Sequence, residues 1–116
     1  FINPTIVRDI PDDSRLVREE QFGPILPVLR YSDINDAIAR ANATAFGLGN
    51  SIWTSNPDRA APVAAQLQSG SVWINKHGDV VPSIPFAGAK MSGMGVEMAN
   101  QGLLEFTQLK VINYAR

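Results

Sequence analysis

The sequence contains no cysteine and only one histidine, His77. The missing thiols exclude disulfide bonds, thiolate nucleophiles and sulfur ligands for metals, and one imidazole cannot form a multi-histidine metal centre. No metal site is therefore expected. One histidine in a loop also defines no serine–histidine–aspartate arrangement, so we assign His77 no catalytic role.

An excess of charge of one sign is missing as well. The formal net charge is −1, and the Lys and Arg residues are scattered along the chain. This distribution argues against a basic surface for phosphates or anionic lipids, so neither a nucleic acid nor a membrane is an expected partner. No apolar run is long enough to cross a bilayer, and no charged segment followed by an apolar one opens the chain. These features predict a soluble, cytoplasmic protein.

The length bounds what the chain can be. With 116 residues it is the size of one domain and too short for a two-domain enzyme. It opens at Phe1, without an initiator methionine and inside an apolar stretch. We therefore expect it to be a piece of a longer polypeptide.

The first regular elements are a strand and a helix. Residues 25–31 are almost continuously apolar and follow Gly23-Pro24, which predicts a strand buried on both faces. Ser32-Asp33 then supply N-cap residues for an amphipathic helix that should end near residues 46–47.

A second strand, a helix and a third strand follow. Residues 51–54 favour a strand, and Asn56-Pro57 provide a cap and a proline for the first turn of a helix that Gly70 is expected to stop. Residues 71–75 form the third predicted strand. This alternation predicts an α/β fold with a parallel sheet and right-handed helical crossovers.

The last part of the chain changes character. Six residues, each Gly or Pro, interrupt residues 76–95, which predicts a long loop that is functional or disordered. A short helix is expected over 96–104 and a strand over 106–114. That strand has no local partner, so pairing with another subunit is a hypothesis that would cover its open edge.

One segment has side chains suited to a dinucleotide. Glu20 and Phe22 lie two residues apart, just before Gly23-Pro24. A carboxylate can accept hydrogen bonds from vicinal ribose hydroxyls, and an aromatic ring can flank a flat heterocycle. The alternative is a solvated glutamate at a helix end and a core phenylalanine, which spacing alone favours.

Two other features are ambiguous. Gly93-Met94-Gly95 ahead of a helix could bind an anion through backbone N–H groups, or could simply form a turn. Phe86, after Pro85, could line a pocket or fill a core.

With these residues in view, the chain resembles the C-terminal segment of the aldehyde dehydrogenase superfamily over essentially its whole length. The motifs keep the family's order and spacing. They are Phe1 to Val7, Glu19 to Pro24, Ala41-Asn42, Phe46-Gly47-Leu48, Gly70 to Asn75, Pro85-Phe86, Lys90 to Gly93, and Gly95 with Glu97.

The resemblance implies cofactor contacts. The glutamate that matches Glu20 hydrogen-bonds the nicotinamide ribose, and the residues that match Phe22 and Leu48 approach the nicotinamide. The cofactor implied is NAD or NADP.

The resemblance also implies a substrate site. Phe86 would line the mouth of the catalytic tunnel, and the loop from His77 through Ile84, which includes Gly78, Asp79 and Val80, would shape the aldehyde pocket. Glu97 would relay protons, or else be a buried structural carboxylate. Ala87, where relatives often have glycine, would add a methyl group beside the tunnel.

The reaction implied is oxidation of an aldehyde to a carboxylic acid through a thioester on a cysteine. No catalytic residue of that route lies in this chain, so the chain alone is expected to be inactive. Residues 1–104 would complete a catalytic domain, and residues 105–116 would form an oligomerisation strand that produces a homo-oligomer. The alternative is a truncated, non-catalytic module that acts in protein association.

Overall fold

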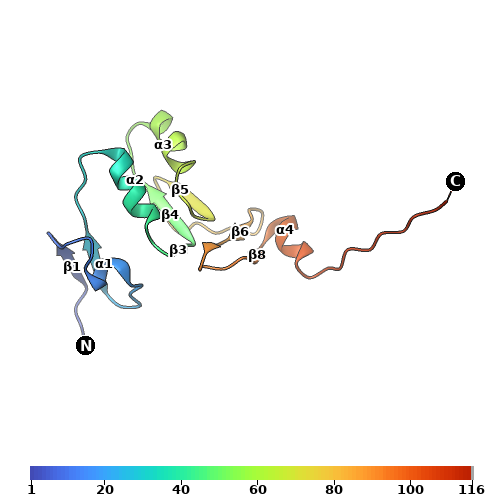
Figure 1. Ribbon diagram of the computed structural model, residues 1–116, viewed down its shortest axis with the longest axis horizontal. Helices are drawn as coiled ribbons and strands as arrows, with labels where there is room; N and C mark the ends of the chain where they lie inside the picture. Colours follow the sequence, from blue (N-terminus) through green and yellow to red (C-terminus); the bar gives the residue numbers. More distant parts are fainter. Residues whose placement is uncertain (116) are drawn as a thin grey trace. The chain divides into compact units, whose positions relative to one another are not determined.

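The computed structural model describes residues 1–115, which divide into two compact units (Figure 1). The first unit spans Phe1–Arg40, and the second runs from Ala41 onward. Helix α2 contains the boundary between them.

The first unit contains a parallel pair of strands, β1 (Thr5–Arg8) and β2 (Ile25–Val28), connected through the short helix α1 (Arg15–Arg18). Thr5 is the register partner of Ile25, and the two strands stay in register to their last residues. Two parallel neighbours require a crossover connection, and α1 lies within it. Parallel pairing with a helical crossover is thus present in this unit.

The exposure of β2 differs from the prediction. Leu26 is 60% exposed and Val28 is 44% exposed, so β2 is not buried on both faces within this chain. Its partner β1 leaves Ile6 70% exposed. The described residues half-bury the face of β2 that carries Ile25 and Pro27 and leave the face of Leu26 and Val28 exposed.

Helix α2 (Ile34–Asn42) begins where the sequence predicted and ends earlier. The Asp33 carboxylate accepts a hydrogen bond from the Asn35 N–H at 3.0 Å, which confirms a cap at this position. At the other end, the Lys90 ammonium donates to the carbonyls of Asn42 (2.7 Å) and Thr44 (3.0 Å). A lysine from elsewhere in the chain therefore satisfies carbonyls that the helix leaves unpaired.

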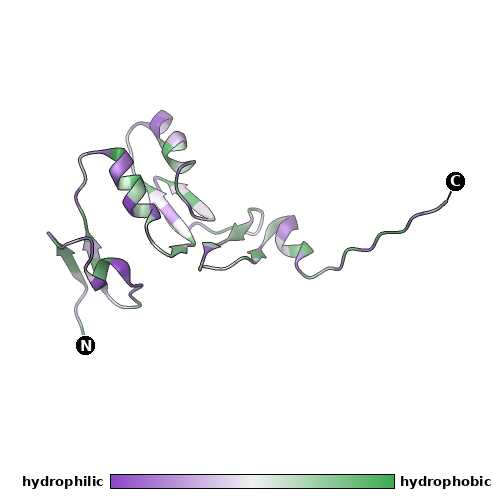
Figure 2. Ribbon diagram, viewed as in Figure 1, coloured by the Kyte–Doolittle hydropathy of each residue, from purple (hydrophilic) through white to green (hydrophobic). Residues whose placement is uncertain are grey.

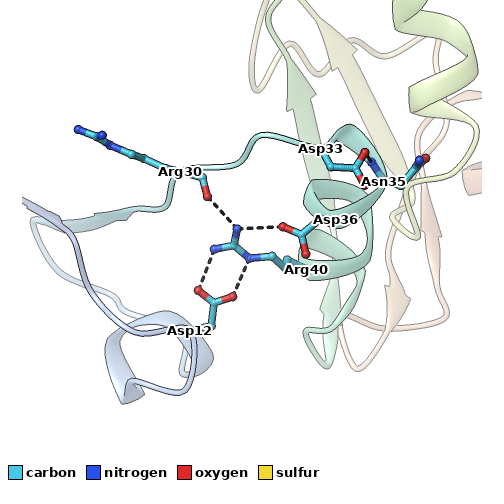
Figure 3. Close-up of polar contacts among 6 residues, drawn as sticks. All are labelled: Asp12, Arg30, Asp33, Asn35, Asp36 and Arg40. Atoms are coloured by element: carbon cyan, nitrogen blue, oxygen red, sulfur yellow. Dashed lines mark hydrogen bonds and ion pairs between the residues drawn. The ribbon is translucent and has the colours of Figure 1, made fainter.

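Arg40 connects three segments of the first unit (Figure 3). Its Nη1 donates to the carbonyl of Arg30 (2.9 Å) and reaches Asp36 (3.4 Å), and its Nη2 donates to Asp12 at 2.8 Å. Arg40 Nε lies 2.6 Å from the other Asp12 oxygen, in ion-pair contact but without hydrogen-bond alignment. The hydrogen bond to Asp12 is the main cause that raises the pKa of Arg40. This ion pair, with its one hydrogen bond, fixes the loop before α1 against α2.

The second unit contains the predicted strand-helix-strand order. Strands β4 (Gly49–Ile52) and β5 (Ser71–Ile74) are parallel, and α3 (Pro57–Ala64) connects them. The Asn56 side chain accepts from Asp58 N–H at 3.1 Å, which confirms the predicted cap before Pro57. Gly70 is not the helix stop, because α3 ends at Ala64.

Asn75 extends the β4–β5 pairing with its side chain. Its Oδ1 accepts from Thr54 N–H at 2.8 Å, and its Nδ2 donates to the Thr54 carbonyl at 2.9 Å. The backbone of Asn75 has φ of 54°, in the left-handed region that asparagine tolerates better than most residues. One side chain thus replaces the next rung of the strand ladder.

Asn75→Ala should lower the free energy of unfolding of the full gene product by about 2 kcal/mol, from the lost hydrogen bonds and the left-handed backbone. Urea unfolding measures the change. Asn75→Gly is the matched control, because it removes the amide and tolerates the positive φ, so it should cost less than alanine. Equal stability of Asn75→Ala and the unaltered protein would contradict this role.

The remaining pairs are short and antiparallel. Strand β3 (Phe46–Gly47) pairs with β7 (Ala89–Lys90), and β6 (Phe86–Ala87) pairs with β8 (Val96–Glu97). Residues 76–95 are therefore not a structureless loop. The described residues form four separate two-stranded sheets, so the expected continuous parallel sheet is not formed by this chain.

The end of the chain also departs from the prediction. Helix α4 (Ala99–Leu104) begins after residue 96, because Val96 and Glu97 pair in β8. Residues 107–115 form neither a helix nor a strand in this single chain (Figure 1). Phe106 and Leu109 are each 90% exposed. A strand here would need a partner, and that pairing remains a prediction.

Few apolar side chains are buried within the described residues. Ile38 and Ala60 are the buried hydrophobic residues, whereas Trp53 is 68% exposed. Apolar and polar residues are interspersed along the C-terminal segment (Figure 2). Trp53 and the C-terminal segment thus leave apolar surface exposed in this chain, whereas Trp73 is half-buried. None of the helices within residues 1–115 has both the length and the apolar composition needed to span a bilayer.

Candidate functional site

Two adjacent glutamates between α1 and β2 have different surroundings. Arg15 holds Glu19 through two hydrogen bonds, Nε to Oε1 at 2.7 Å and Nη2 to Oε2 at 2.9 Å. These hydrogen bonds are the main cause that lowers the pKa of Glu19. The neighbouring Glu20 carboxylate makes no hydrogen bond or ion pair with any of residues 1–115. Of these two glutamates, Glu20 is the one whose acceptor oxygens are free of contacts with residues 1–115.

The side chain of Phe22 is also accessible to another molecule in this chain. Its side chain is 98% exposed, so it does not fill a core formed by the described residues. Glu20 is a solvated carboxylate just past a helix, as the alternative interpretation also expects. An exposed carboxylate acceptor beside an exposed aromatic ring fits a ribose and a flat heterocycle.

The second unit brings two other predicted residues together. Phe86 in β6 is the register partner of Glu97 in β8, so the two are direct neighbours across the antiparallel pair. Leu48, between β3 and β4, is 46% exposed. Glu97 is exposed, which excludes a carboxylate buried within this chain.

The backbone directly after Glu97 is strained. Met98 has φ of 66° and ψ of 172°, and Ala99 has φ of 49°. The Met98 conformation is one that residues other than glycine rarely adopt. Gly102 packs close to the Glu97 backbone, since a Cβ at Gly102 would lie 2.6 Å from the Glu97 carbonyl carbon. This turn fixes the point at which the chain leaves strand β8 after Glu97.

The segment predicted to shape a substrate pocket has its own internal contacts. The Trp73 indole Nε1 donates to the Asp79 carbonyl at 2.9 Å, and the Lys76 ammonium pairs with the Asp79 carboxylate. The His77 ring lies edge-on to Trp73, with centroids 5.3 Å apart. Gly78 has φ of 68°, which allows the turn between them.

Sequence reasoning missed Trp73 and Lys76 as partners of this segment. The opposite charges of Lys76 and Asp79, three residues apart, were a usable signal. The contact of the indole N–H with a backbone carbonyl has no sequence signal. Val80 is 39% exposed and has no such polar anchor.

The glycines at 93 and 95 do not form an anion site at a helix start. Strand β8 separates them from α4, which is itself only 6 residues long. Gly93 has φ of 114° and donates its N–H to the Lys90 carbonyl at 3.5 Å. The turn interpretation is therefore correct for these residues.

The predicted residues are divided between the two units. Glu20 and Phe22 belong to the first unit, and the remaining predicted site residues belong to the second. Their assembly into one site stays a prediction.

Comparison with known proteins gives a consistent result over nearly the whole chain. A family model described as the aldehyde dehydrogenase family matches residues 1–112. Retinaldehyde dehydrogenase 3 of Mus musculus is 42% identical over 112 residues, which are 97% of this chain and 22% of the mouse protein. An NADP(+) succinate-semialdehyde dehydrogenase of Deinococcus radiodurans is 43% identical, over 97% of this chain and 24% of that protein.

Solved structures agree with the sequence relatives. The chain is similar to an aldehyde dehydrogenase of Mycobacterium tuberculosis complexed with NAD+, with a TM-score of 0.89 and 35% identity. That match covers 100% of this chain and 25% of the bacterial enzyme. The chain thus spans about a quarter or less of the proteins it matches.

Proposed function

The chain belongs to the aldehyde dehydrogenase family, and on that premise we propose that it forms part of an enzyme that oxidises an aldehyde to a carboxylic acid with NAD or NADP. The catalytic thiol, the base and most of the dinucleotide-binding domain would lie outside these 116 residues, which contain no cysteine. This chain would supply contacts to the nicotinamide end of the cofactor and part of the aldehyde pocket.

The observation that carries the proposal is the difference between the two adjacent glutamates. Arg15 donates hydrogen bonds to both carboxylate oxygens of Glu19, whereas neither carboxylate oxygen of Glu20 has a hydrogen-bond partner in residues 1–115. Glu20 would accept hydrogen bonds from the two hydroxyls of the nicotinamide ribose. When bound, the dinucleotide would supply a hydride acceptor.

Other residues would orient the reactants. Phe22, which is 98% exposed, would pack near the nicotinamide ring, and Leu48 would approach it as well. Phe86 would line the mouth of the tunnel, beside Glu97, whose carboxylate would move a proton between the site and solvent.

The aldehyde pocket would be formed in part by residues 77–84. We propose that His77, Gly78, Asp79 and Val80 present this segment to the substrate. Asp79 would do so chiefly through its backbone position, since Lys76 holds its carboxylate.

We also propose that residues 105–116 mediate homo-oligomer formation. The exposure of Phe106, Leu109 and Tyr114, at 90%, 90% and 88%, supports a role in association. The same exposure is what favours the second candidate function, a non-catalytic module that acts only in protein association.

An activity assay distinguishes the two functions. The full gene product should reduce NAD or NADP only when an aldehyde is present, and the isolated 116-residue chain should show no turnover, because it has no thiol to form the thioester. Absorbance of the reduced nicotinamide follows the reaction. A full gene product that binds no dinucleotide and oxidises no aldehyde would support the association module, and turnover by the isolated chain would contradict the proposed division of roles.

A further inference from the structure

The indole of Trp73 is held in one position by its neighbours. Trp73 lies in β5, and its ring packs on Gly49 of β4, where an added Cβ would come within 2.5 Å of Cζ3. A side chain at position 49 would therefore displace the ring. The ring position fixes the direction of the indole N–H.

That N–H anchors the first half of the segment predicted to face the substrate. It donates to the Asp79 carbonyl at 2.9 Å, and the same turn also contains the Lys76–Asp79 ion pair and the His77 ring, which lies edge-on to Trp73. Three different contacts thus converge on residues 76–79.

The second half of the segment has a separate anchor. The Pro82 carbonyl accepts from Ala99 N–H at 2.9 Å, and Ile84 N–H donates to the Val81 carbonyl at 3.1 Å. Val80 lies between these two anchors in the sequence and is 39% exposed. Ile84 follows the second anchor and is 59% exposed. The segment therefore presents apolar side chains from a backbone that is fixed at both ends.

We propose that Trp73 is a positioning residue that sets aldehyde selectivity by fixing residues 77–80 through its indole N–H. The proposal rests on the proposed function. Trp73 itself touches the turn and not the reacting atoms, so its loss alters how the pocket fits an aldehyde and not the chemical step. Longer aldehydes, which would reach the displaced Val80, are affected most.

Trp73→Phe in the full gene product tests the proposal, because phenylalanine retains an aromatic ring and lacks the N–H. The KM for long-chain aldehydes should rise roughly 3- to 10-fold, as expected for one lost hydrogen bond, while kcat for acetaldehyde stays within about 2-fold. Hydrogen–deuterium exchange at the amides of residues 77–80 should become faster.

The chain offers a matched control and a second variant. Trp53 is 68% exposed, and its indole makes no hydrogen bond with residues 1–115, so Trp53→Phe should leave both measurements unchanged. Lys76→Met removes only the ion pair to Asp79 at an exposed side chain, and should shift both measurements in the same direction by a smaller factor.

Several results would overturn the proposal. They are unchanged amide exchange in Trp73→Phe, an unchanged KM profile, or an equal fall in kcat for every aldehyde including acetaldehyde, which would indicate a general defect of the fold. If the unaltered protein oxidises no aldehyde, the proposed function and the selectivity claim fail together, and amide exchange alone decides whether Trp73 positions the turn.

Discussion

Gly70→Ala is expected to lower the free energy of unfolding of the full gene product by about 4 kcal/mol or more. A Cβ at Gly70 would lie 1.7 Å from the Ala87 carbonyl oxygen and 2.5 Å from its carbon. These atoms belong to the backbone of β6, so no side-chain rotation relieves the clash. The start of β5 and strand β6 would have to separate. Urea unfolding or the yield of soluble protein measures the effect.

Gly95→Ala is the control for this substitution. No atom lies within 4 Å of a Cβ at Gly95, and Gly95 is not among the residues with positive φ. It should change the stability by less than about 1 kcal/mol. A Gly70→Ala protein as stable as Gly95→Ala would show that β5 and β6 do not approach this closely.

Glu20→Gln is expected to lower kcat/KM for the cofactor roughly 10- to 100-fold. The amide has one acceptor oxygen and no charge, so it accepts more weakly and cannot offer a separate oxygen to each ribose hydroxyl as a carboxylate does. Hydrogen bonds to charged groups contribute about 1.5–3 kcal/mol each, which corresponds to that factor. Steady-state kinetics with varied NAD or NADP measures the change, and single-turnover kinetics separates cofactor positioning from hydride transfer.

The adjacent carboxylate gives a matched control. Glu19→Gln removes the same charge one residue away, at a side chain that Arg15 already holds. It should leave the cofactor kinetics within about 2-fold, since an exposed pair of this kind contributes little. Equal effects of the two substitutions would show that local charge, and not a contact of Glu20 with the ribose, determines the kinetics.

Local signals predicted much of the fold. The caps at Asp33 and Asn56 were identified correctly, because capping depends on a side chain and the N–H groups two residues further on. The parallel pair β4–β5 also followed from alternating strand and helix patterns.

Non-local contacts explain the errors. Strand β3 pairs Phe46 with Lys90, and a two-residue strand has no periodicity that a sequence pattern could reveal. Helix α2 ends at Asn42, whose side chain bonds the Gln66 carbonyl and Gln68 N–H, both at 2.8 Å. These partners lie 24 and 26 residues away, so propensity alone placed the helix end too late.

The sequence predicted some residues of the candidate site and missed others. Spacing alone favoured a solvated glutamate and a core phenylalanine, and only the family resemblance gave Glu20 and Phe22 roles at a cofactor. The structure then distinguished Glu20 from Glu19 through Arg15, a contact across four residues of a short helix. The hydrogen bond of Trp73 to Asp79 could not be predicted from the sequence, because a backbone carbonyl acceptor can belong to any residue type.

The ammonium of Lys90 lies on two carbonyls at the end of α2, where the helix carries partial negative charge. Its positive charge is therefore partly offset by these carbonyl dipoles, whereas that of Lys76 is paired with the Asp79 carboxylate. Lys76 therefore adds little net positive potential around residues 76–90, and the positive potential of Lys90 is reduced. Electrostatic attraction from these two side chains would give an anionic aldehyde little advantage over an uncharged one.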